Sequence, residues 1–519
     1  MQNKYCYNLG LLFYQVAAAH PNHIAIKYPS GESYTYLQLN HFSNQTANYL
    51  LSKSIKPGDV VGILNNKSFG AYSLMIACLK IGAIYTNFDI TSPWLRILKI
   101  LSNCQPKIIF NDHDNHLLID GIKTHYNTNI IDLFSEPFRK DLAKLNNENL
   151  AEQSNHVNGN EPAYIMFTSG STGFPKGALM SHSNVLNFIN WGQQTFDVTT
   201  NDVFTNANPI YFDNSVFDFY ISLFSGACLV PFSTDIVKNA RILVNTVNET
   251  KCTIWFSVPS LIVYLLTTKS LQPTDFISLT RISFGGEGFP KPKLKQLYDL
   301  YGKRIKLYNV YGPTECTCIC SSYVITEKDF ENLNEFAPLG SHMAPNFGYE
   351  IIPIEEGNKN CGELCLTGPN VGLGYYNDVE RTSKSFVQNP NKKFPQRMYK
   401  TGDIVEKREN GYIYFKGRAD NQIKHMGFRI ELEEIESVIN SFTYVNETGV
   451  IYKKITPDLG QIIAFVSLNT KKDETEVIEN LKKTLPPYMI PKKIIILDTL
   501  PKNKNGKIDR TQLAQLQNE

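Results

Sequence analysis

Thr168-Ser-Gly-Ser-Thr-Gly-Phe-Pro-Lys-Gly177 is a run of small hydroxyl residues and glycines that carries a single lysine. Hydroxyl groups and backbone N–H groups donate hydrogen bonds to phosphate oxygens, and glycine lets the backbone approach a ligand closely. The lysine adds a positive charge. An apolar, strand-like segment at 163–167 leads directly into the run. Although Gly/Ser-rich segments often form flexible surface loops, this arrangement predicts a loop that holds phosphate groups.

The run does not follow either of the commonest phosphate-binding patterns. The P-loop pattern needs a second glycine five residues after the first, followed by Lys-Ser/Thr. Counted from Gly170, that place holds Pro175, and Gly177 comes after Lys176. The dinucleotide pattern G-x-G-x-x-G fails as well, because Thr168 stands where its first glycine belongs. The loop therefore belongs to a different class of nucleotide or phosphate site.

Length and composition are typical of a globular protein with several structural units. The chain has 519 residues, of which 42% are hydrophobic and 19% charged, and a formal net charge of +2. This length predicts about three or four units. A net charge near zero argues against a nucleic acid partner. No apolar run reaches the roughly 18 residues that a membrane-spanning helix needs, so we expect no membrane partner.

The N-terminal segment 9–19 has the composition of either a signal peptide or an amphipathic helix. Leu9, Leu12, Phe13 and Val16 follow the spacing of one helix face. The charged region that a signal peptide requires is reduced to one lysine, which favours the helix. The ten cysteines lack the spacing of a small disulfide framework. We therefore expect reduced thiols and a cytoplasmic protein.

The first third of the chain alternates strand-like and helix-like segments. Strands are predicted at 23–27, 59–64 and 81–85, and a helix at 68–80. This alternation predicts a parallel sheet wrapped by helices. The polar stretch 111–160 has no clear periodicity, and we expect it to be an irregular loop region.

Three later segments read as buried strands that end in turns. They cover 251–258, with a helix starting near Pro259, then 281–287 and 307–315. Ligands of α/β proteins bind at the carboxyl ends of such strands. At the end of the third strand, Tyr311 can stack on a flat base, and Thr314-Glu315 can meet phosphate and Mg²⁺, which prefers oxygen ligands.

Cys316, Cys318 and Cys320 alternate with other residues, so on a strand their side chains would share one face. A zinc site would need two pairs of ligands or nearby histidines. We therefore expect these cysteines to line a pocket or the core.

Asp213 lies among aromatic and apolar residues in the segment 208–218. Burying a carboxylate is unfavourable unless it meets a cation. The side chain could instead cap the helix that follows, since Asp is a good helix N-cap. Asp213 is thus a candidate either for binding a cationic group or for helix capping.

These motifs together resemble the adenylate-forming enzymes, which include acyl- and aryl-CoA synthetases, luciferases and the adenylation domains of nonribosomal peptide synthetases. The resemblance extends over nearly the whole chain. It rests on the run at 168–177 and on four further segments, Asn309-Val-Tyr-Gly-Pro-Thr-Glu315, Tyr399-Lys-Thr-Gly-Asp403, 417–436 and Asn505-Gly-Lys-Ile-Asp-Arg510.

The resemblance implies an α/β fold with two domains. Residues 1–417 would form a large N-terminal adenylation core of two doubly wound α/β subdomains plus a small β-barrel. Residues 418–519 would form a small, mobile α+β C-terminal domain, with a hinge at 418–420 that includes Asp420.

The resemblance also implies roles for residues that bind ATP and Mg²⁺. Asn309 and Tyr311 would hold adenine, Asp403 the two ribose hydroxyls, and Glu315 the magnesium ion. Thr314 would contact the phosphates and, with Glu315 and Lys507, would be catalytic. The complete set expected around ATP is Thr168, Ser169, Gly170, Ser171, Thr172, Gly173, Lys176, Gly286, Glu287, Asn309, Val310, Tyr311, Gly312, Pro313, Thr314, Asp403, Phe415, Arg418 and Lys507.

The resembling peptide-synthetase domains use an aspartate at the position of Asp213 to bind the ammonium group of an amino acid. Phe212 would lie near the substrate carboxylate. The side-chain pocket carried over residue by residue comprises Asn214, Phe217, Phe256, Ser283, Gly285, Val310, Cys318 and Ile319. The two phenylalanines would reduce the volume of this pocket, and the absence of a side chain at Gly285 would enlarge it. Without a charge in its walls, this pocket favours a small or medium neutral amino acid.

The implied reaction joins an amino-acid carboxylate to the α-phosphate of ATP and releases pyrophosphate into the loop 168–177. Lys507 would offset the repulsion between the two anions. The C-terminal domain would then turn at Asp420, withdraw Lys507 and admit a phosphopantetheine arm. No carrier-protein serine motif follows Lys507, so the carrier is expected to be a separate chain, unless this sequence is an excised piece of a longer synthetase. His425-Met426 stands where the family usually has Ile-Arg.

Two alternatives remain at this stage. The chain could be a CoA ligase for another carboxylic acid, which Asp213 argues against. It could also be an inactive scaffold relative, which the presence of Lys176, Asp403 and Lys507 argues against.

Overall fold

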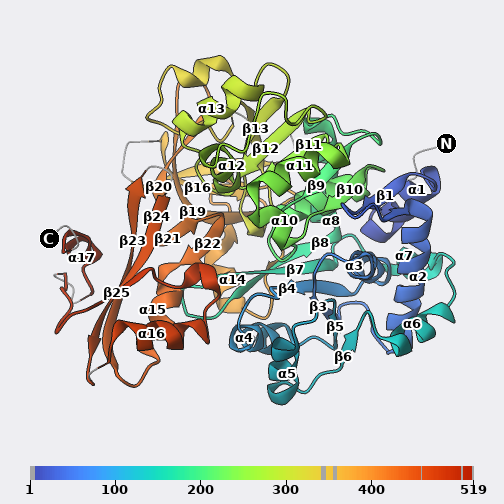
Figure 1. The fold of residues 1–519 in the computed structure, drawn as a ribbon, viewed down its shortest axis with the longest axis horizontal. Coiled ribbons are helices and arrows are strands. Elements are labelled where there is room, and N and C mark those ends of the chain that lie inside the picture. The colour runs from blue at the N-terminus through green and yellow to red at the C-terminus, as the bar shows by residue number, and fades with distance from the viewer. Residues whose placement is uncertain are drawn as a thin grey trace.

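The computed structural model describes residues 6–340, 347–354, 359–456, 459–470, 472–503 and 507–516. A large core is followed by a smaller C-terminal domain that packs against one side of it (Figure 1). Residues 504–506 of the terminal motif lie outside the described residues. The mixed α/β fold with a separate C-terminal domain agrees with the predicted fold class.

The first sheet has the strand order β17-β8-β7-β4-β3-β5-β6, in which β7, β4, β3, β5 and β6 are parallel neighbours. Its strands are β3 (Val60–Leu64), β4 (Ile84–Phe88), β5 (Ile108–Asn111), β6 (Ile130–Asp132), β7 (Pro162–Thr168), β8 (Lys176–Ser181) and β17 (Gly374–Tyr375). The helices near it are α1 (Leu9–Ala19), α2 (Tyr36–Ser52), α3 (Phe69–Ile81), α4 (Trp94–Cys104), α5 (His116–His125), α6 (Glu136–Ala143), α7 (Ala151–His156) and α8 (His182–Thr195).

Helices cover both faces of this sheet, which explains why its central strands β3 and β4 are buried along their whole length. Along β3, Val61 and Ile63 pack into the cluster that contains α2 and α3. Val60 and Leu64 point to the other face and pack with α4 and α5. The helix predicted at 9–19 is present as α1, and Asn8 caps it by accepting a hydrogen bond from the N–H of Leu11.

The prediction of an irregular loop region at 111–160 was wrong. The segment contains α5, β6, α6 and α7. These elements are short and mostly polar on the outside, so periodicity gave little signal. Local caps hold them in place: Asn115 accepts from the N–H of Leu118, and Ser135 accepts from that of Phe138.

The second sheet has the order β14-β13-β12-β11-β9-β10-β1-β2. Its strands are β1 (Ile24–Lys27), β2 (Ser33–Thr35), β9 (Val203–Asn206), β10 (Cys228–Pro231), β11 (Ile254–Ser257), β12 (Arg281–Gly285), β13 (Lys306–Tyr311) and β14 (Ser321–Val324). Helical elements between them are α9 (Asn214–Val216), the π-helix η1 (Phe217–Ile221), α10 (Thr234–Lys238), α11 (Ala240–Thr250), α12 (Pro259–Thr267), α13 (Lys291–Tyr301), and the 3₁₀ turns η2 (Thr314–Cys316) and η3 (Glu327–Phe330).

The main core lies between the two large sheets. Phe256 on β11 and Tyr308 on β13 belong to the same apolar cluster as Tyr85 and Tyr164 of the first sheet. Trp255, on the other face of β11, packs with α11, α12 and α13. This packing brings the carboxyl ends of β7, β12 and β13 to one edge of the core.

An antiparallel sheet follows at the place where a small barrel was predicted. It consists of β15 (Gly348–Pro353), β16 (Cys361–Thr367), β18 (Phe386–Gln388), β19 (Arg397–Lys407) and β20 (Ile413–Arg418), with α14 (Val379–Ser385) before β18. Its long strand β19 pairs with β18 through its first residues and with β20 through its last.

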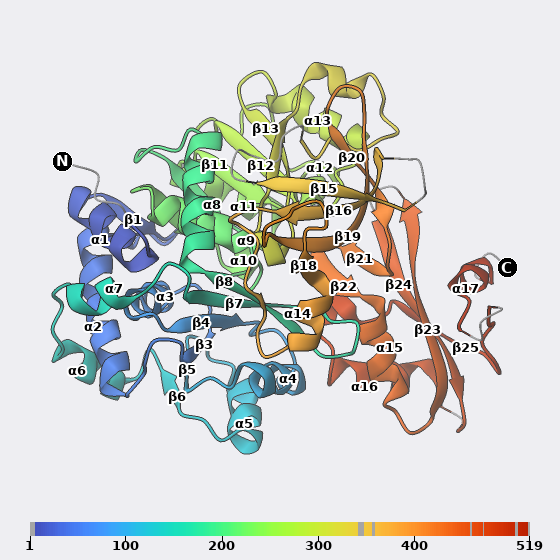
Figure 2. The same ribbon diagram turned by 180° about the vertical axis from the view of Figure 1, so that it is seen from behind.

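The C-terminal domain begins with the hairpin β21 (Gln422–His425) and β22 (Phe428–Glu431), which leads into α15 (Leu432–Asn440). A sheet of β23 (Val445–Thr456), β24 (Leu459–Leu468) and β25 (Lys493–Ile496) follows, with α16 (Glu474–Lys482), the 3₁₀ turn η4 (Pro487–Met489) and α17 (Arg510–Gln515). The hairpin and α15 face the core, whereas α17 lies at the outer edge of the domain (Figures 1 and 2). Of the helices described, none combines the length and apolarity needed to cross a bilayer.

Candidate active site

The predicted phosphate loop is the connection of a hairpin. β7 ends at Thr168 and β8 begins at Lys176, and these two residues are paired in the ladder. Gly173 has a φ of +80°, which favours glycine, and a Cβ on Gly170 would lie 2.1 Å from the carbonyl oxygen of Phe174. The glycines are therefore required by the close path of the backbone.

The loop borders a cavity between the core and the C-terminal domain. The core side of the cavity is formed by the ends of β7, β12 and β13 and by the segment before α9. Its lining residues are Arg96, Phe167, Thr168, Ser169, Phe212, Asp213, Asn214, Phe256, Gly286, Val310, Tyr311, Gly312, Pro313, Thr314, Cys318, Ile319, Thr401, Asp403, Arg418, Gln422, Lys424, Gly427, Arg429 and Tyr488.

Asp213 faces this cavity and is bonded to a second predicted site residue. Its Oδ2 accepts a 2.6 Å hydrogen bond from the hydroxyl of Thr314. Although it stands at the start of α9, its side chain makes no capping hydrogen bond to that helix. Burial raises the pKa of this carboxyl, while the bond from Thr314 opposes the shift. The capping alternative is therefore wrong, and the carboxylate is available to a cationic ligand.

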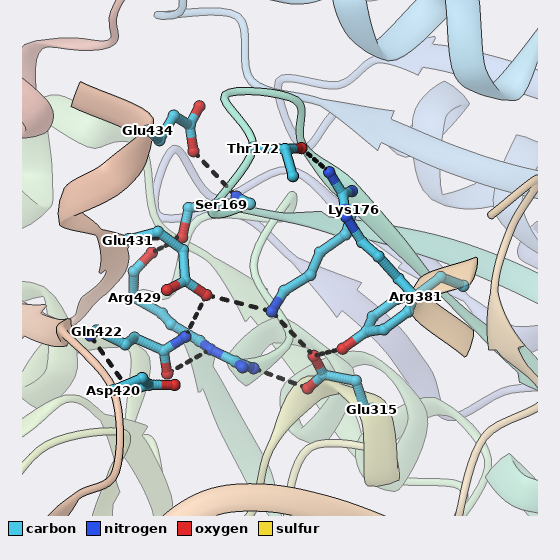
Figure 3. A network of polar contacts seen from close by, with 12 residues as sticks. Ser169, Thr172, Lys176, Glu315, Arg381, Asp420, Gln422, Arg429, Glu431 and Glu434 are labelled. Atoms are coloured by element: carbon cyan, nitrogen blue, oxygen red, sulfur yellow. Dashed lines mark hydrogen bonds and ion pairs between the residues drawn. The ribbon is translucent and has the colours of Figure 1, made fainter. Parts of the chain in front are cut away.

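Glu315 is the most enclosed acid of the site. Its carboxylate accepts bonds from Arg429 at 2.7 Å and from the hydroxyl of Tyr375 at 2.7 Å, and Lys176 lies 3.8 Å away (Figure 3). Burial alone would raise the pKa of Glu315, but the two cations outweigh it and lower the pKa to about 2. Glu315 is therefore ionised at neutral pH.

Asp403, Tyr311 and Arg418 form a second linked group. Asp403 accepts from the hydroxyl of Tyr311 at 2.6 Å and from the guanidinium of Arg418 at 2.7 Å. Arg418 also pairs with Asp420 at 2.6 Å. The proposed hinge residue Asp420 is thus linked to the predicted ribose ligand Asp403 through Arg418.

The residues predicted around adenine lie by a neighbouring cavity. It is lined by Gly286, Glu287, Gly288, Phe289, Asn309, Val310, Tyr311, Phe336, Ala337, Leu339, Phe415 and Lys424. Asn309 donates to the carbonyl of Pro338. Aromatic walls and a buried amide are suited to a flat heterocycle.

Only part of the predicted side-chain pocket lines the main cavity. Asn214, Phe256, Val310, Cys318 and Ile319 do so. Phe217, Ser283 and Gly285 are fully packed beneath them and are buried.

The absence of a side chain at Gly285 does not enlarge the pocket, so that prediction was wrong. A Cβ there would lie 2.4 Å from the carbonyl oxygen of Val310. The position is filled by the neighbouring strand, because Gly285 and Val310 are direct partners in the β12–β13 ladder.

The cysteines at 316, 318 and 320 do not share a strand face, contrary to expectation. Cys316 ends the turn η2, and Thr317 and Cys318 both have positive φ, 59° and 73°. The three side chains are nevertheless buried. Across the described part of the chain, no group of three or more His, Cys, Asp or Glu residues could hold a metal ion by itself.

The donor set at Glu315 fits magnesium bound together with a nucleotide. Mg²⁺ commonly uses one or two carboxylates and completes its shell with phosphate oxygens and water. Glu315 supplies one ionised carboxylate, and the adjacent Thr314 supplies a hydroxyl in the cavity that the phosphate loop borders. In the present arrangement the guanidinium of Arg429 contacts this carboxylate.

Lys507 lies away from these groups. It is exposed, and its backbone exchanges hydrogen bonds with Asn503, whose Oδ1 accepts from the Lys507 N–H. It precedes α17, which lies at the outer edge of the C-terminal domain (Figure 2). Its predicted catalytic role therefore requires another placement of that domain and stays a prediction.

Several site residues were missed by the sequence analysis. Arg429, Glu431 and Glu434 belong to the segment 417–436, in which only Arg418 and Asp420 had received roles. The sequence feature that could have identified them is their charge, close to the predicted hinge at 418–420. Arg96, which pairs with Glu434, sits in an ordinary amphipathic helix and gave none.

Comparison with known proteins agrees with this geometry. Residues 13–376 match the AMP-binding enzyme family, and residues 434–507 match the AMP-binding enzyme C-terminal domain. The chain is 33% identical over 512 residues to bacitracin synthase 1 of Bacillus licheniformis, but spans only 9% of its length. It is 31% identical over 505 residues to the D-alanine–D-alanyl carrier protein ligase of Listeria monocytogenes serovar 1/2a, covering 93% of this chain and 94% of the ligase.

Among solved structures, the Vibrio cholerae adenylation domain AlmE in complex with glycyl-adenosine-5'-phosphate matches with a TM-score of 0.84 and 24% identity, covering 100% of this chain and 99% of that one. Holo-PA1221, with adenylation and PCP domains and a vinylsulfonamide inhibitor, matches with a TM-score of 0.82 and 22% identity, covering 98% and 84%. At these identities the likeness concerns the fold. The family match over most of the chain, together with the phosphate loop, shows that this chain belongs to the AMP-binding enzymes.

Proposed function

We propose that this ligase activates a small or medium neutral amino acid with ATP and transfers it to the phosphopantetheine arm of a separate carrier protein. The observation that carries the proposal is Asp213. A carboxylate that faces the cavity beside Thr314 is suited to an ammonium group, because the two opposite charges satisfy each other where water is scarce. A plain carboxylic acid would leave Asp213 without a cation.

In the first half-reaction, the substrate carboxylate attacks the α-phosphorus of ATP and the bond to pyrophosphate breaks. The loop 168–177 would hold the departing pyrophosphate through its N–H groups, hydroxyls and Lys176. Lys507 would offset the repulsion between the two reacting anions after the C-terminal domain has moved. When bound at Glu315, Mg²⁺ would neutralise phosphate charge.

A second, largely apolar cavity supports transfer to a carrier arm. It shares Phe212, Asp213 and Asn214 with the main cavity and continues between α12 and the tip of the β21–β22 hairpin. Tyr264 and Met426 line it and are exposed to solvent, so this cavity reaches the surface. A thin flexible thiol arm could follow this path to an adenylate held at Asp213.

The side chains that line the pocket favour the smaller amino acids among the proposed substrates. Phe256, Val310, Cys318 and Ile319 close the cavity around Asn214, and Phe217 and Ser283 lie behind that wall. The names of the relatives point the same way, since they mention D-alanine and a glycyl adenylate. Glycine and both enantiomers of alanine are therefore the first candidates.

A reducing, cytoplasmic location is part of the proposal. The nine cysteines from Cys78 onward are free thiols in the described residues, and all of them except Cys361 are buried. Thiols in these numbers remain reduced in the cytoplasm of most organisms.

The test is amino-acid-dependent exchange of pyrophosphate into ATP, measured over all common L- and D-amino acids. We expect exchange with one or a few small neutral amino acids. A preference for aspartate, glutamate, lysine or arginine would overturn the pocket assignment. Activation only of acids without an amino group would instead identify a CoA ligase of another kind. Absence of any exchange would favour an inactive relative.

A further inference from the structure

Two cations of the core hold the tip of the phosphate loop. They are Lys99 on α4 and Arg381 on α14. We propose that both are positioning residues for the β- and γ-phosphates of ATP, because they fix the loop in the shape that presents its hydrogen-bond donors. The inference rests on the proposed activation with ATP and adds the side chains that shape its phosphate site.

Arg381 acts through the hydroxyl of Thr172. Its guanidinium donates to this hydroxyl oxygen (Figure 3) and, at 3.4 Å, to the carbonyl of Phe174. A hydroxyl that accepts a hydrogen bond from a cation keeps its own proton for donation, and the neighbouring charge polarises that donor. Arg381 therefore fixes the position of Thr172 and leaves its hydroxyl as a donor for a phosphate oxygen.

Lys99 holds the next residues of the loop. Its ammonium group donates to the carbonyl of Gly173 at 3.0 Å and lies 5.1 Å from the centre of the Phe174 ring. In a trans peptide unit the N–H points away from the carbonyl, so this bond turns the N–H of Phe174 away from Lys99. The side chain of Phe174 is 54% exposed. Its contact with the Lys99 cation accounts for an aromatic ring at this surface position.

The two anchors belong to one frame. The side-chain amide of Asn103, near the end of α4, donates to the carbonyl of Tyr376 at 3.1 Å, and Asn377 donates to the carbonyl of Asn103 at 2.8 Å. Helix α14 follows directly, and Asp378 before its first residue pairs with Arg381 at 3.1 Å. Because α4 and the start of α14 are bonded to each other, the loop tip is held between fixed points.

A glycine-rich loop benefits from such anchors. Within the tip, the N–H of Gly173 donates to the carbonyl of Gly170 at 3.0 Å. Glycine residues lose much conformational freedom when a ligand orders them. Anchors that order the loop in advance reduce this cost and so increase the affinity for phosphate. Both anchors and the loop belong to the core, so their contacts do not require a particular placement of the C-terminal domain.

The experiment measures by calorimetry the binding of ATP and of pyrophosphate, each with MgCl₂, and of AMP. The variants are K99M, R381Q and the double variant K99M/R381Q. K384M is the matched control, because Lys384 also lies on α14 but pairs with Glu380 at 2.6 Å. AMP is the discriminating ligand, since it lacks the two phosphates that the loop would hold.

We expect ATP and pyrophosphate to bind about three- to tenfold more weakly to K99M and to R381Q, and more weakly still to the double variant. The affinity for AMP should stay at the parental value in all variants, and K384M should bind all three ligands as the parent does. Hydrogen exchange at 171–174 should be faster in the double variant than in the parent, because the turn at Gly173 is no longer anchored.

Equal affinities of K99M/R381Q and K384M for ATP and pyrophosphate would overturn the inference. A loss of AMP affinity as large as the loss of ATP affinity would also overturn it, because it would show a general structural defect. In the parent, exchange at 171–174 as fast as in an unstructured peptide would contradict the anchoring without the use of any variant. None of these measurements uses an amino acid. A failed exchange screen would therefore remove the proposed substrate while these readouts still report on the loop.

Discussion

At the scale of single residues, Asp213 distinguishes an amino acid from a plain acid. Its Oδ2 is held by Thr314 and its carboxylate borders the cavity. Asp213→Ala should weaken transition-state binding of amino acids by about 2–5 kcal/mol, because the substrate ammonium loses its desolvated partner. The comparison is kcat/KM in pyrophosphate exchange. An unchanged kcat/KM for amino acids in Asp213→Ala would instead favour a ligase that activates carboxylic acids without an amino group.

Asp213 also predicts a pH dependence. Burial raises the pKa of its carboxyl, so as the pH falls this group takes up a proton earlier than an exposed aspartate would. The neutral form cannot pair with an ammonium group. KM for the amino acid should therefore rise on acidification, and the rise should begin at a higher pH than the titration of an exposed aspartate would give. Asp213→Asn, which has no ionisable group there, should have a high KM that does not follow this change.

At the scale of elements, the turn between β13 and η2 depends on Gly312. A Cβ at this position would lie 2.3 Å from the carbonyl oxygen of Cys318 and 2.7 Å from the Cα of Ile319. Both are backbone atoms that cannot move alone. Gly312→Ala should destabilise the fold by about 1–3 kcal/mol. It should also reduce adenylation, because Thr314 and Glu315 follow directly.

Urea unfolding and exchange kinetics check this prediction. Gly411→Ala is a useful comparison, since a Cβ there meets nothing within 4 Å, although its φ of +79° adds some strain. A Gly312→Ala variant with parental stability and activity would show that the turn adapts.

At the scale of the whole molecule, Lys507 is a test of domain movement. It is exposed, and the hydrogen bonds recorded for it use its backbone. Lys507→Ala should therefore change the free energy of unfolding by no more than about 0.5 kcal/mol. It should nevertheless abolish most adenylate formation if the domain brings this lysine to the cavity.

Transfer of an already formed adenylate to a thiol should survive in Lys507→Ala, because that step uses the docked arrangement. Pyrophosphate exchange and single-turnover thioester formation separate the two half-reactions. Parental exchange in this variant would exclude the role of Lys507.

The sequence by itself determined the local chemistry. The order of hydroxyls, glycines and one lysine at 168–177 predicts a phosphate loop, because each residue type acts through its own backbone or side chain. The periodicity of apolar residues predicted α1, α3 and β3, because burial on a helix or strand repeats at a fixed spacing. A carboxylate among aromatic residues marked Asp213, because an isolated buried charge needs a partner.

Only the tertiary structure decided which residues far apart in the sequence contact one another. Arg96 and Glu434 are separated by 338 positions, and nothing in either neighbourhood indicates the other. Gly285 lies against Val310 because two strands are adjacent in a sheet, so its missing side chain is occupied rather than open. Arg429 meets Glu315 because the hairpin docks against the end of β13. Long-range pairing depends on how domains pack, and local propensity carries no information about it.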